Sequence, residues 1–252
     1  MGDSSFFVHD KTAQATRIEE KQNIVLEFLS HEVFSTSEIL GQLLNLGRTS
    51  TYKTLKAMEK KDMVRLYDIE YELAQRGKQT IWGLTPKGAL LATDLNDFQV
   101  DFYEAGRIAT STMAHSIAIQ RVKVTGFSKG WTDWLSSRKL RQIATKDKTK
   151  WLQIPDALAI SPQAKRIAFE IEKTIKTPKR YQVILSNYAK MFLDKTVDEV
   201  FYICPENIAK RLERLFSNID KIIVDGKSYP LHENVLKRIR FLSFEEWNNI
   251  IE

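Results

Sequence analysis

One alternating segment constrains this 252-residue chain more than any other stretch. In residues 167–172, IAFEIE, the apolar side chains of Ile167, Phe169 and Ile171 alternate with Ala168, Glu170 and Glu172. A period of two is typical of a β-strand, whose successive side chains point to opposite faces. The segment therefore predicts a strand with Glu170 and Glu172 on one face.

A second strand is predicted just upstream. The apolar run that ends at Ile160 is followed by Ser-Pro-Gln, which are turn formers, so the two runs read as an antiparallel hairpin. A loop over residues 161–165 pairs Ile160 with Arg166. Counting outward from that pair places Asp156 opposite Glu170.

Three carboxylates, Asp156, Glu170 and Glu172, are thus expected within a few ångströms of one another. Like charges that face each other destabilise a sheet and raise each other's pKa, so such a cluster calls for a cation. Oxygen ligands suit Mg²⁺ or Mn²⁺, which activate water for attack on a phosphate. We interpret the three acids as candidate metal ligands and catalytic residues for cleavage of a nucleic-acid backbone. A solvated acidic face without chemistry is the alternative.

Basic residues follow the acidic strand. Thr177 and Pro178 are typical of an N-cap and a first helical position, which places Lys179 and Arg180 in the first turn of a helix. Cations there oppose the helix dipole, and a bound phosphate would explain them. Lys176 lies just before this helix and is a further candidate for the catalytic site.

The composition favours an anionic partner. Lys and Arg outnumber Asp and Glu by 38 to 32, which gives a formal net charge of +6 at pH 7. No apolar run reaches the roughly 18 residues of a membrane span, and the N-terminus lacks the pattern of a signal peptide. Cys204 is the only cysteine, so we expect no internal disulfide. From these features together we expect a cytoplasmic protein without membrane insertion.

The N-terminal part predicts three short helices followed by a two-stranded ribbon. Ser35 and Glu38 fit a capping box for the second helix, which stops near Gly47. The other predicted elements are a helix over residues 20–29, a third helix over 49–61 that buries Thr51, Leu55 and Met58, strands at 63–67 and 80–84, and a helix from Thr85. This order is typical of a winged helix-turn-helix.

The third helix and the ribbon tip carry the candidate DNA contacts. The helix would present basic and hydroxyl side chains, and the tip would act as the wing. The residues concerned are Arg48, Ser50, Tyr52, Lys53 and Lys56 on the helix, and Arg76 and Lys78 at the tip. Winged helices also serve as protein-interaction modules, so DNA binding is a hypothesis weighed against that use.

The chain is expected to form two domains of mixed α+β or α/β character. The predicted divisions are a flexible arm over 1–18, the winged helix-turn-helix over 19–93, a linker helix over 94–111 and a second domain over 112–252. In the second domain we predict helices at 112–125, 178–192, 206–216 and from 244, a strand edge around 131–135, and strands at 199–204, 221–224 and 239–242. That order is typical of a mixed sheet flanked by helices.

Together these features resemble a known family. Pro155-Asp156, followed by Glu170-Ile171-Glu172, looks like the PD-(D/E)xK nuclease signature. With the winged helix, His115 and the run EIEKTIKTPKRY, the chain resembles the replication-relaxation family, which includes MobC-type plasmid mobilisation relaxases. The resemblance implies a restriction-endonuclease-like core that nicks supercoiled double-stranded plasmid DNA at a transfer origin, with Mg²⁺ or Mn²⁺ and an accessory mobilisation protein.

The chain departs from the strict signature at the lysine. The motif would place Lys at position 172, where this chain has Glu172. Lys173 would point to the other strand face, so Lys176 is the candidate that acts from further along. Tyr181 belongs to an apolar helix stripe, which favours a core residue and a metal-activated water as the nucleophile. His115 is either a further metal ligand or a buried core histidine.

Two other functions remain open from the sequence. One is a restriction-type endonuclease that cuts both strands. The other is a DNA-binding regulator of replication or transcription whose nuclease-like core is catalytically silent.

Overall fold

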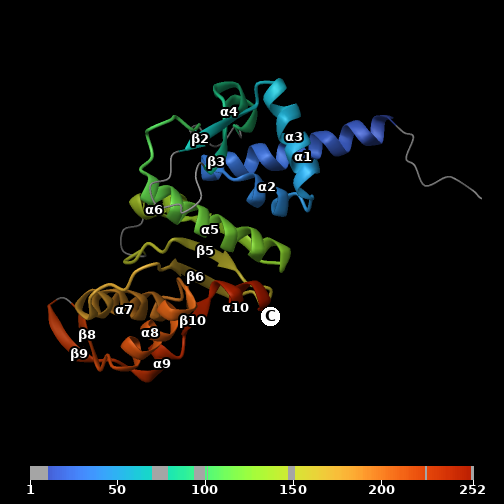
Figure 1. Ribbon diagram of the computed structural model, residues 1–252. Coiled ribbons are helices and arrows are strands. Elements are labelled where there is room, and N and C mark those ends of the chain that lie inside the picture. The colour runs from blue at the N-terminus through green and yellow to red at the C-terminus, as the bar shows by residue number, and fades with distance from the viewer. Residues whose placement is uncertain are drawn as a thin grey trace, which may run out of the picture. The chain divides into compact units, whose positions relative to one another are not determined.

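The computed structural model has a mixed α+β fold with helices and mixed sheets (Figure 1). The residues that it describes are 11–69, 79–93, 100, 102–146, 151–224 and 226–250. The chain divides into two compact units, Met1–Gln120 and Arg121–Glu252, and the division falls within the long helix α5 (Thr110–Ser128).

The first unit combines helices with a three-stranded antiparallel sheet of order β1-β3-β2. Its elements are α1 (Lys11–Glu32), β1 (Phe34–Ser35), α2 (Ser37–Leu43), α3 (Arg48–Lys60), β2 (Val64–Ile69), β3 (Gln79–Leu84) and α4 (Pro86–Ala92). Helix α4 begins as the sequence predicts, because Thr85 caps it through the Gly88 amide and Pro86 occupies its first turn.

The third predicted helix is confirmed as α3, which buries Thr51, Leu55 and Met58. The predicted capping box at Ser35 is wrong. Thr36 is the N-cap of α2 and accepts a hydrogen bond from the Ile39 amide at 3.3 Å. Ser35 instead belongs to β1, where it pairs with Trp82 of β3. This two-residue strand is too short to produce a periodic signal in the sequence.

Helix α1 is longer than predicted, and its core side includes Phe28, which is 4% exposed. It begins at Lys11, so residues 11–18 are helical and do not form an arm; residues 1–10 lie outside the described part. Ile24 is 42% exposed, whereas Val25 and Leu29 are fully buried. The predicted linker helix over 94–111 is wrong for residues 102–109, which are coil and turn.

The second unit is built on a five-stranded mixed sheet of order β10-β7-β6-β5-β4. Strands β10, β7 and β6 are parallel neighbours, and β6, β5 and β4 are antiparallel. The elements are β4 (Thr132–Ser136), α6 (Ser137–Lys146), β5 (Ala157–Ile160), β6 (Arg166–Ile171), α7 (Pro178–Leu193), β7 (Glu199–Cys204), α8 (Glu206–Ser217), β8 (Lys221–Val224), β9 (Lys227–Pro230), α9 (Glu233–Leu236), β10 (Ile239–Ser243) and α10 (Phe244–Asn249). Of these, α6, β9 and α9 lie where the sequence predicted no element.

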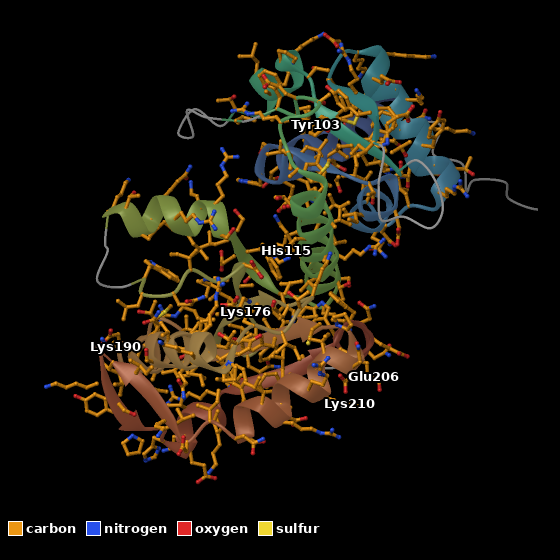
Figure 2. All side chains as sticks on the ribbon, turned by 60° about the vertical axis from the view of Figure 1, so that its left-hand side comes forward. Tyr103, His115, Lys176, Lys190, Glu206 and Lys210 are labelled. Carbon is orange, nitrogen blue, oxygen red and sulfur yellow. The ribbon has the colours of Figure 1, made fainter. Side chains whose placement is uncertain are left out.

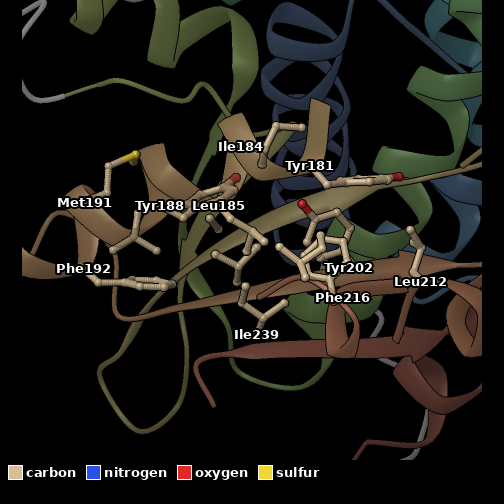
Figure 3. Packing of buried hydrophobic residues seen from close by; sticks show 14 of the residues in the cluster. Tyr181, Ile184, Leu185, Tyr188, Met191, Phe192, Tyr202, Leu212, Phe216 and Ile239 are labelled. Carbon is tan, nitrogen blue, oxygen red and sulfur yellow. The ribbon is translucent and has the colours of Figure 1, made fainter. Parts of the chain in front are cut away.

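The two faces of this sheet have different cores. One face packs against α7 and α8, where Tyr181, Tyr188, Tyr202 and Phe216 belong to a single apolar cluster (Figure 3). The opposite face is an aromatic cluster in which Trp131 lies 5.2 Å, centroid to centroid, from both Phe169 and Trp247. The indole of Trp247 also donates to the Val122 carbonyl of α5 at 3.1 Å.

The hairpin register predicted from the turn residues is confirmed. Ile160 pairs with Arg166 and Ala157 pairs with Phe169, so the next position outward sets Asp156 opposite Glu170. Edge strand β4 is irregular, because its register against β5 shifts between Thr132 and Leu135. Asp133 lies within this irregularity and has a φ of 50°.

Candidate functional site

Glu170 is a buried acid on the face of β6 that α7 covers. Its side chain is 9% exposed, and its Oε1 accepts hydrogen bonds from the Tyr188 hydroxyl at 2.5 Å and from the Gln153 amide at 3.1 Å. Burial raises the pKa of Glu170 to about 7, and the negative charge of Asp156 is the second cause. The two hydrogen bonds oppose that rise and offset only part of it.

Asp156 is held in place at the end of the hairpin. Its Oδ2 accepts the Ile171 amide at 2.8 Å, and its backbone carbonyl accepts the Ser137 amide at 3.0 Å. The first bond ties Asp156 to the end of β6, and the second ties it to the start of α6. The structure therefore brings together the carboxylates of Asp156 and Glu170, as the register predicts.

Glu172 has partners of its own. It forms an ion pair with Lys176, and its Oε2 accepts the Tyr181 hydroxyl at 3.3 Å. Lys176 lies just before α7 (Figure 2), and its charge is the weakest of the influences on the pKa of Glu170. Glu172 thus has a lysine as its partner, and its role as a third ligand of a cation stays a prediction. In the described ranges no three His, Cys, Asp or Glu side chains are grouped to hold a metal ion.

The start of α7 matches the sequence prediction. Thr177 is the N-cap and Pro178 the first helical residue, although the Thr177 side chain makes no capping hydrogen bond. Lys179 and Arg180 are exposed in the first turn. Tyr181 is fully buried, which confirms that it is a core residue.

His115 lies on α5 in the first unit (Figure 2). Its side chain is half-buried. Its role as a metal ligand therefore stays a prediction.

Helix α3 presents most of the predicted DNA contacts. Arg48, Ser50, Tyr52 and Lys53 are exposed. Lys56 is different, because its ammonium lies 2.6 Å from Glu59 and 5.7 Å from the centroid of the Trp82 ring. The hydrogen bond to Glu59 is the main cause of the raised pKa of Lys56. Arg76 and Lys78 lie outside the described residues.

A groove runs beside α3 in the first unit. It is lined by residues of α2, of the turn between α2 and α3, of α3 itself and of the neighbouring sheet. Arg48 and Tyr52 lie on its wall, together with the hydroxyls of Ser37, Thr49 and Thr80. The groove offers hydroxyl groups and one guanidinium, which are groups that contact DNA phosphates, and it also carries the carboxylate of Glu38.

Sequence reasoning missed three side chains around the acids. Gln153 and Tyr188 donate to Glu170, and Tyr202, which pairs with Glu170 across β6 and β7, has a buried hydroxyl with no hydrogen-bond partner in the described part of the chain. Burial, followed by the charge of Glu170, raises the pKa of Tyr202 well above its ordinary value. A signal was present for Tyr188, since Tyr181 and Tyr188 are seven residues apart and share one helix face.

Comparisons with known proteins give one family and one distant structure. No curated protein matched the chain. A solved structure of a mutant of ZitR from Lactococcus lactis, in apo form, is 15% identical and covers 54% of this chain and 81% of its own, with a TM-score of 0.25. A likeness at that score carries no argument about fold or function. In the described residues, no helix has the length and apolar character needed to cross a membrane.

The family comparison covers more than half of the chain. The sequence model of the family described as replication-relaxation matches residues 26–199. This range contains helix α3 and the hairpin that carries Asp156 and Glu170. The chain therefore belongs to the replication-relaxation family.

Proposed function

We propose that this protein is a DNA relaxase that binds double-stranded plasmid DNA and nicks it at a transfer origin during mobilisation. Family membership supports a role in plasmid replication or relaxation. In the proposal, the first unit is a winged helix that contacts DNA through α3. The second unit is a PD-(D/E)xK nuclease-like core that cleaves the backbone.

The pairing of Asp156 with Glu170 is the observation that carries the proposal. Two carboxylates lie at one end of a hairpin, and one of them is buried so deeply that its pKa rises to about 7. Burial and the neighbouring charge of Asp156 both disfavour the ionised form of Glu170. Functional sites are where such perturbed groups gather.

The donor set of this pair fits Mg²⁺ or Mn²⁺. Such an ion is often held by one or two carboxylates, while water and substrate phosphate fill its other positions. Asp156 and Glu170 would hold the ion, which when bound supplies an activated water and stabilises the phosphate under attack. Loss of the Glu170 proton would accompany binding, because a carboxylate binds a metal in its ionised form.

The remaining residues have supporting roles in this proposal. Glu172 and Lys176 neutralise each other, and this pair fixes the segment between β6 and α7. Lys179 and Arg180 at the exposed start of α7 would contact the DNA phosphates. An accessory mobilisation protein would act with the enzyme at the transfer origin.

A second candidate is a DNA-binding regulator of replication or transcription with a silent core. The hydrogen bonds around the acids favour it, since Tyr188 and Gln153 donate to Glu170, and Tyr181 and Lys176 bind Glu172. Acids bound in this way are also compatible with a purely structural role. A restriction-type enzyme that cuts both strands is a third outcome of the same test.

Nicking of a supercoiled plasmid that carries the cognate transfer region tests these candidates. The wild-type protein is compared with Asp156→Ala and Glu170→Ala in Mg²⁺ or Mn²⁺ and in EDTA, and the matched control is Glu213→Ala, which changes an exposed residue of α8. The proposal expects metal-dependent open circles that both site variants lose and the control retains. Linear DNA would indicate the restriction-type enzyme. A protein that shifts the plasmid in a gel without cutting it, even with host extract, would be the regulator.

A further inference from the structure

We infer that α6 is a second DNA-binding surface, which holds the phosphodiester backbone beside Asp156. This inference rests on the proposed function and names how the second unit contacts its substrate. Helix α6 spans Ser137–Lys146 and was not predicted from the sequence. Its position, its core contact and its charge all point to this role.

The sheet register places the start of α6 at the acid pair. Ser136, the last residue of β4, pairs with Ala157, so Ser137 lies opposite Asp156. The Ser137 amide donates to the Asp156 carbonyl at 3.0 Å, and Ser136 accepts the Lys139 amide at 3.4 Å. The helix is therefore joined to the segment that carries Asp156 by a backbone hydrogen bond.

Leu140 fixes which side of α6 faces the core. It is fully buried and belongs to the same apolar cluster as Tyr188, the residue that donates to Glu170. The opposite side of the helix carries Arg141 and Lys146, which are exposed. Helix α6 and the acid pair thus lie on the same face of the sheet, and the basic side of the helix remains accessible.

The charge of α6 is of one sign. Its sequence, SRKLRQIATK, contains four basic residues and no acidic one, and two of the four, Arg138 and Lys139, lie in the first turn. Cations in a first turn oppose the helix dipole, and they add to the positive charge of this helix. Helix α8 of the same unit differs, because it carries two acids, Glu206 and Glu213, beside its three basic residues, and Lys210 pairs with Glu206 at 2.6 Å (Figure 2).

A polyanion with regularly spaced charges fits this surface. The cations extend along the helix from the first turn beside Asp156 to Lys146 in the last turn. Successive phosphates of one DNA strand present the matching charge, and contacts of this kind position the backbone without reading sequence. The backbone bound on α6 would thereby be kept next to the acids that are proposed to cleave it.

Salt-dependent binding of full-length protein to a duplex without a transfer-origin sequence tests the inference. The first variant combines Arg141→Gln and Lys146→Gln, two exposed positions at which the fold is not at risk. The second combines Arg138→Gln and Lys139→Gln, beside Asp156. The control combines Arg211→Gln and Arg214→Gln on α8, which removes the same charge from exposed positions in the same unit. Binding is measured in EDTA, so that no cleavage occurs.

Removing one phosphate-binding cation should reduce the slope of log affinity against log salt by about 0.9. At 0.1 M salt this change corresponds to a loss of affinity of roughly eightfold. Both α6 variants should show a reduction of at least this size, and the α8 control should keep the wild-type slope. Equal slopes in the wild type, the α6 variants and the control would overturn the inference.

Because the assay needs no cleavage, reduced slopes in a protein that never nicks would refute the proposed enzyme alone. Nicking with unchanged slopes would refute the α6 surface alone.

Discussion

The hydroxyl of Tyr188 donates to Oε1 of Glu170 at 2.5 Å, which links helix α7 to strand β6. This bond stabilises the ionised carboxylate and lowers the pKa of Glu170, but burial and the charge of Asp156 outweigh it. The side chain therefore titrates in the neutral range. The titration of Glu170 can be measured through the free energy of unfolding.

The fold should lose stability as the pH rises toward neutrality, and Glu170→Gln should remove that dependence. The pKa of Glu170 is raised from 4.5 to about 7, so the folded state binds the proton more tightly than the unfolded state does. Its contribution is fully present below pH 4.5 and is lost as the pH rises through about 7. Between pH 5 and pH 8 the stability of Glu170→Gln relative to wild type should increase by roughly 2 to 3 kcal/mol.

Urea unfolding at both pH values measures this difference. The control is Glu213→Gln, which changes an exposed glutamate on α8 and should follow the wild type at both pH values. If the free energy of unfolding of Glu170→Gln changes with pH as that of the wild type does, Glu170 is ionised throughout the range and is not buried in the folded protein.

The pair of Glu172 and Lys176 should show a measurable coupling energy. Lys176→Met leaves a carboxylate that is only 9% exposed with Tyr181 as its remaining partner, whereas the double variant with Glu172→Gln leaves no buried charge. A double-mutant cycle should give a coupling of about 1.5 kcal/mol, below the value for a fully buried pair because Lys176 is 29% exposed.

The exposed pair of Glu206 and Lys210 on α8 is the matched control for that cycle, since solvent screens it. Its coupling should lie near the limit of measurement. Equal coupling in the two cycles would mean that solvent screens Glu172 as well.

Replacing Tyr202 by Phe should stabilise the protein. The hydroxyl of Tyr202 is buried and has no hydrogen-bond partner in the described part of the chain. Removing an unsatisfied polar group from the core should raise the free energy of unfolding by about 1 kcal/mol. Tyr188→Phe is the control, because its hydroxyl donates to Glu170 and its removal should destabilise. A decrease in stability in Tyr202→Phe would show that the hydroxyl has a partner.

On α3, Lys53→Ala should weaken DNA binding more than Lys56→Ala. Lys53 is exposed, whereas Lys56 is held by Glu59 at 2.6 Å and lies over the Trp82 ring. Removing one phosphate-binding cation at Lys53 should lower affinity roughly eightfold at 0.1 M salt. Fluorescence anisotropy with a labelled duplex measures both variants. A larger effect from Lys56 would mean that DNA displaces it from Glu59.

Local patterns were enough to predict the elements that position the site. The alternation in 167–172 and the turn residues after Ile160 determine the hairpin register, because strand period and loop length together leave one pairing. Thr177 and Pro178 likewise predict the start of α7. Both features are determined by residues that are close together in the chain, so the sequence alone is enough to predict them.

The partners of the acids could not be predicted in the same way. Lys176 and Tyr181 bind Glu172, and Tyr188 reaches Glu170 from a separate helix. Such choices are made by tertiary packing, which hydrophobic periodicity does not report. The sequence indicates helix α6 only weakly. Leu140 is a fully buried side chain in an otherwise basic run, and the bond from the Lys139 amide to the Ser136 hydroxyl forms only in the folded chain.

The irregularity of β4 affects whether a strand of another chain can pair with this edge of the sheet. An edge strand with a regular ladder is a template on which a strand from another chain can add. Here the register shift between Thr132 and Leu135, with Asp133 at a φ of 50°, interrupts that ladder. A bulge of this kind bends the strand and leaves backbone groups out of line for a neighbour. This margin of the sheet is thereby protected against edge-to-edge aggregation.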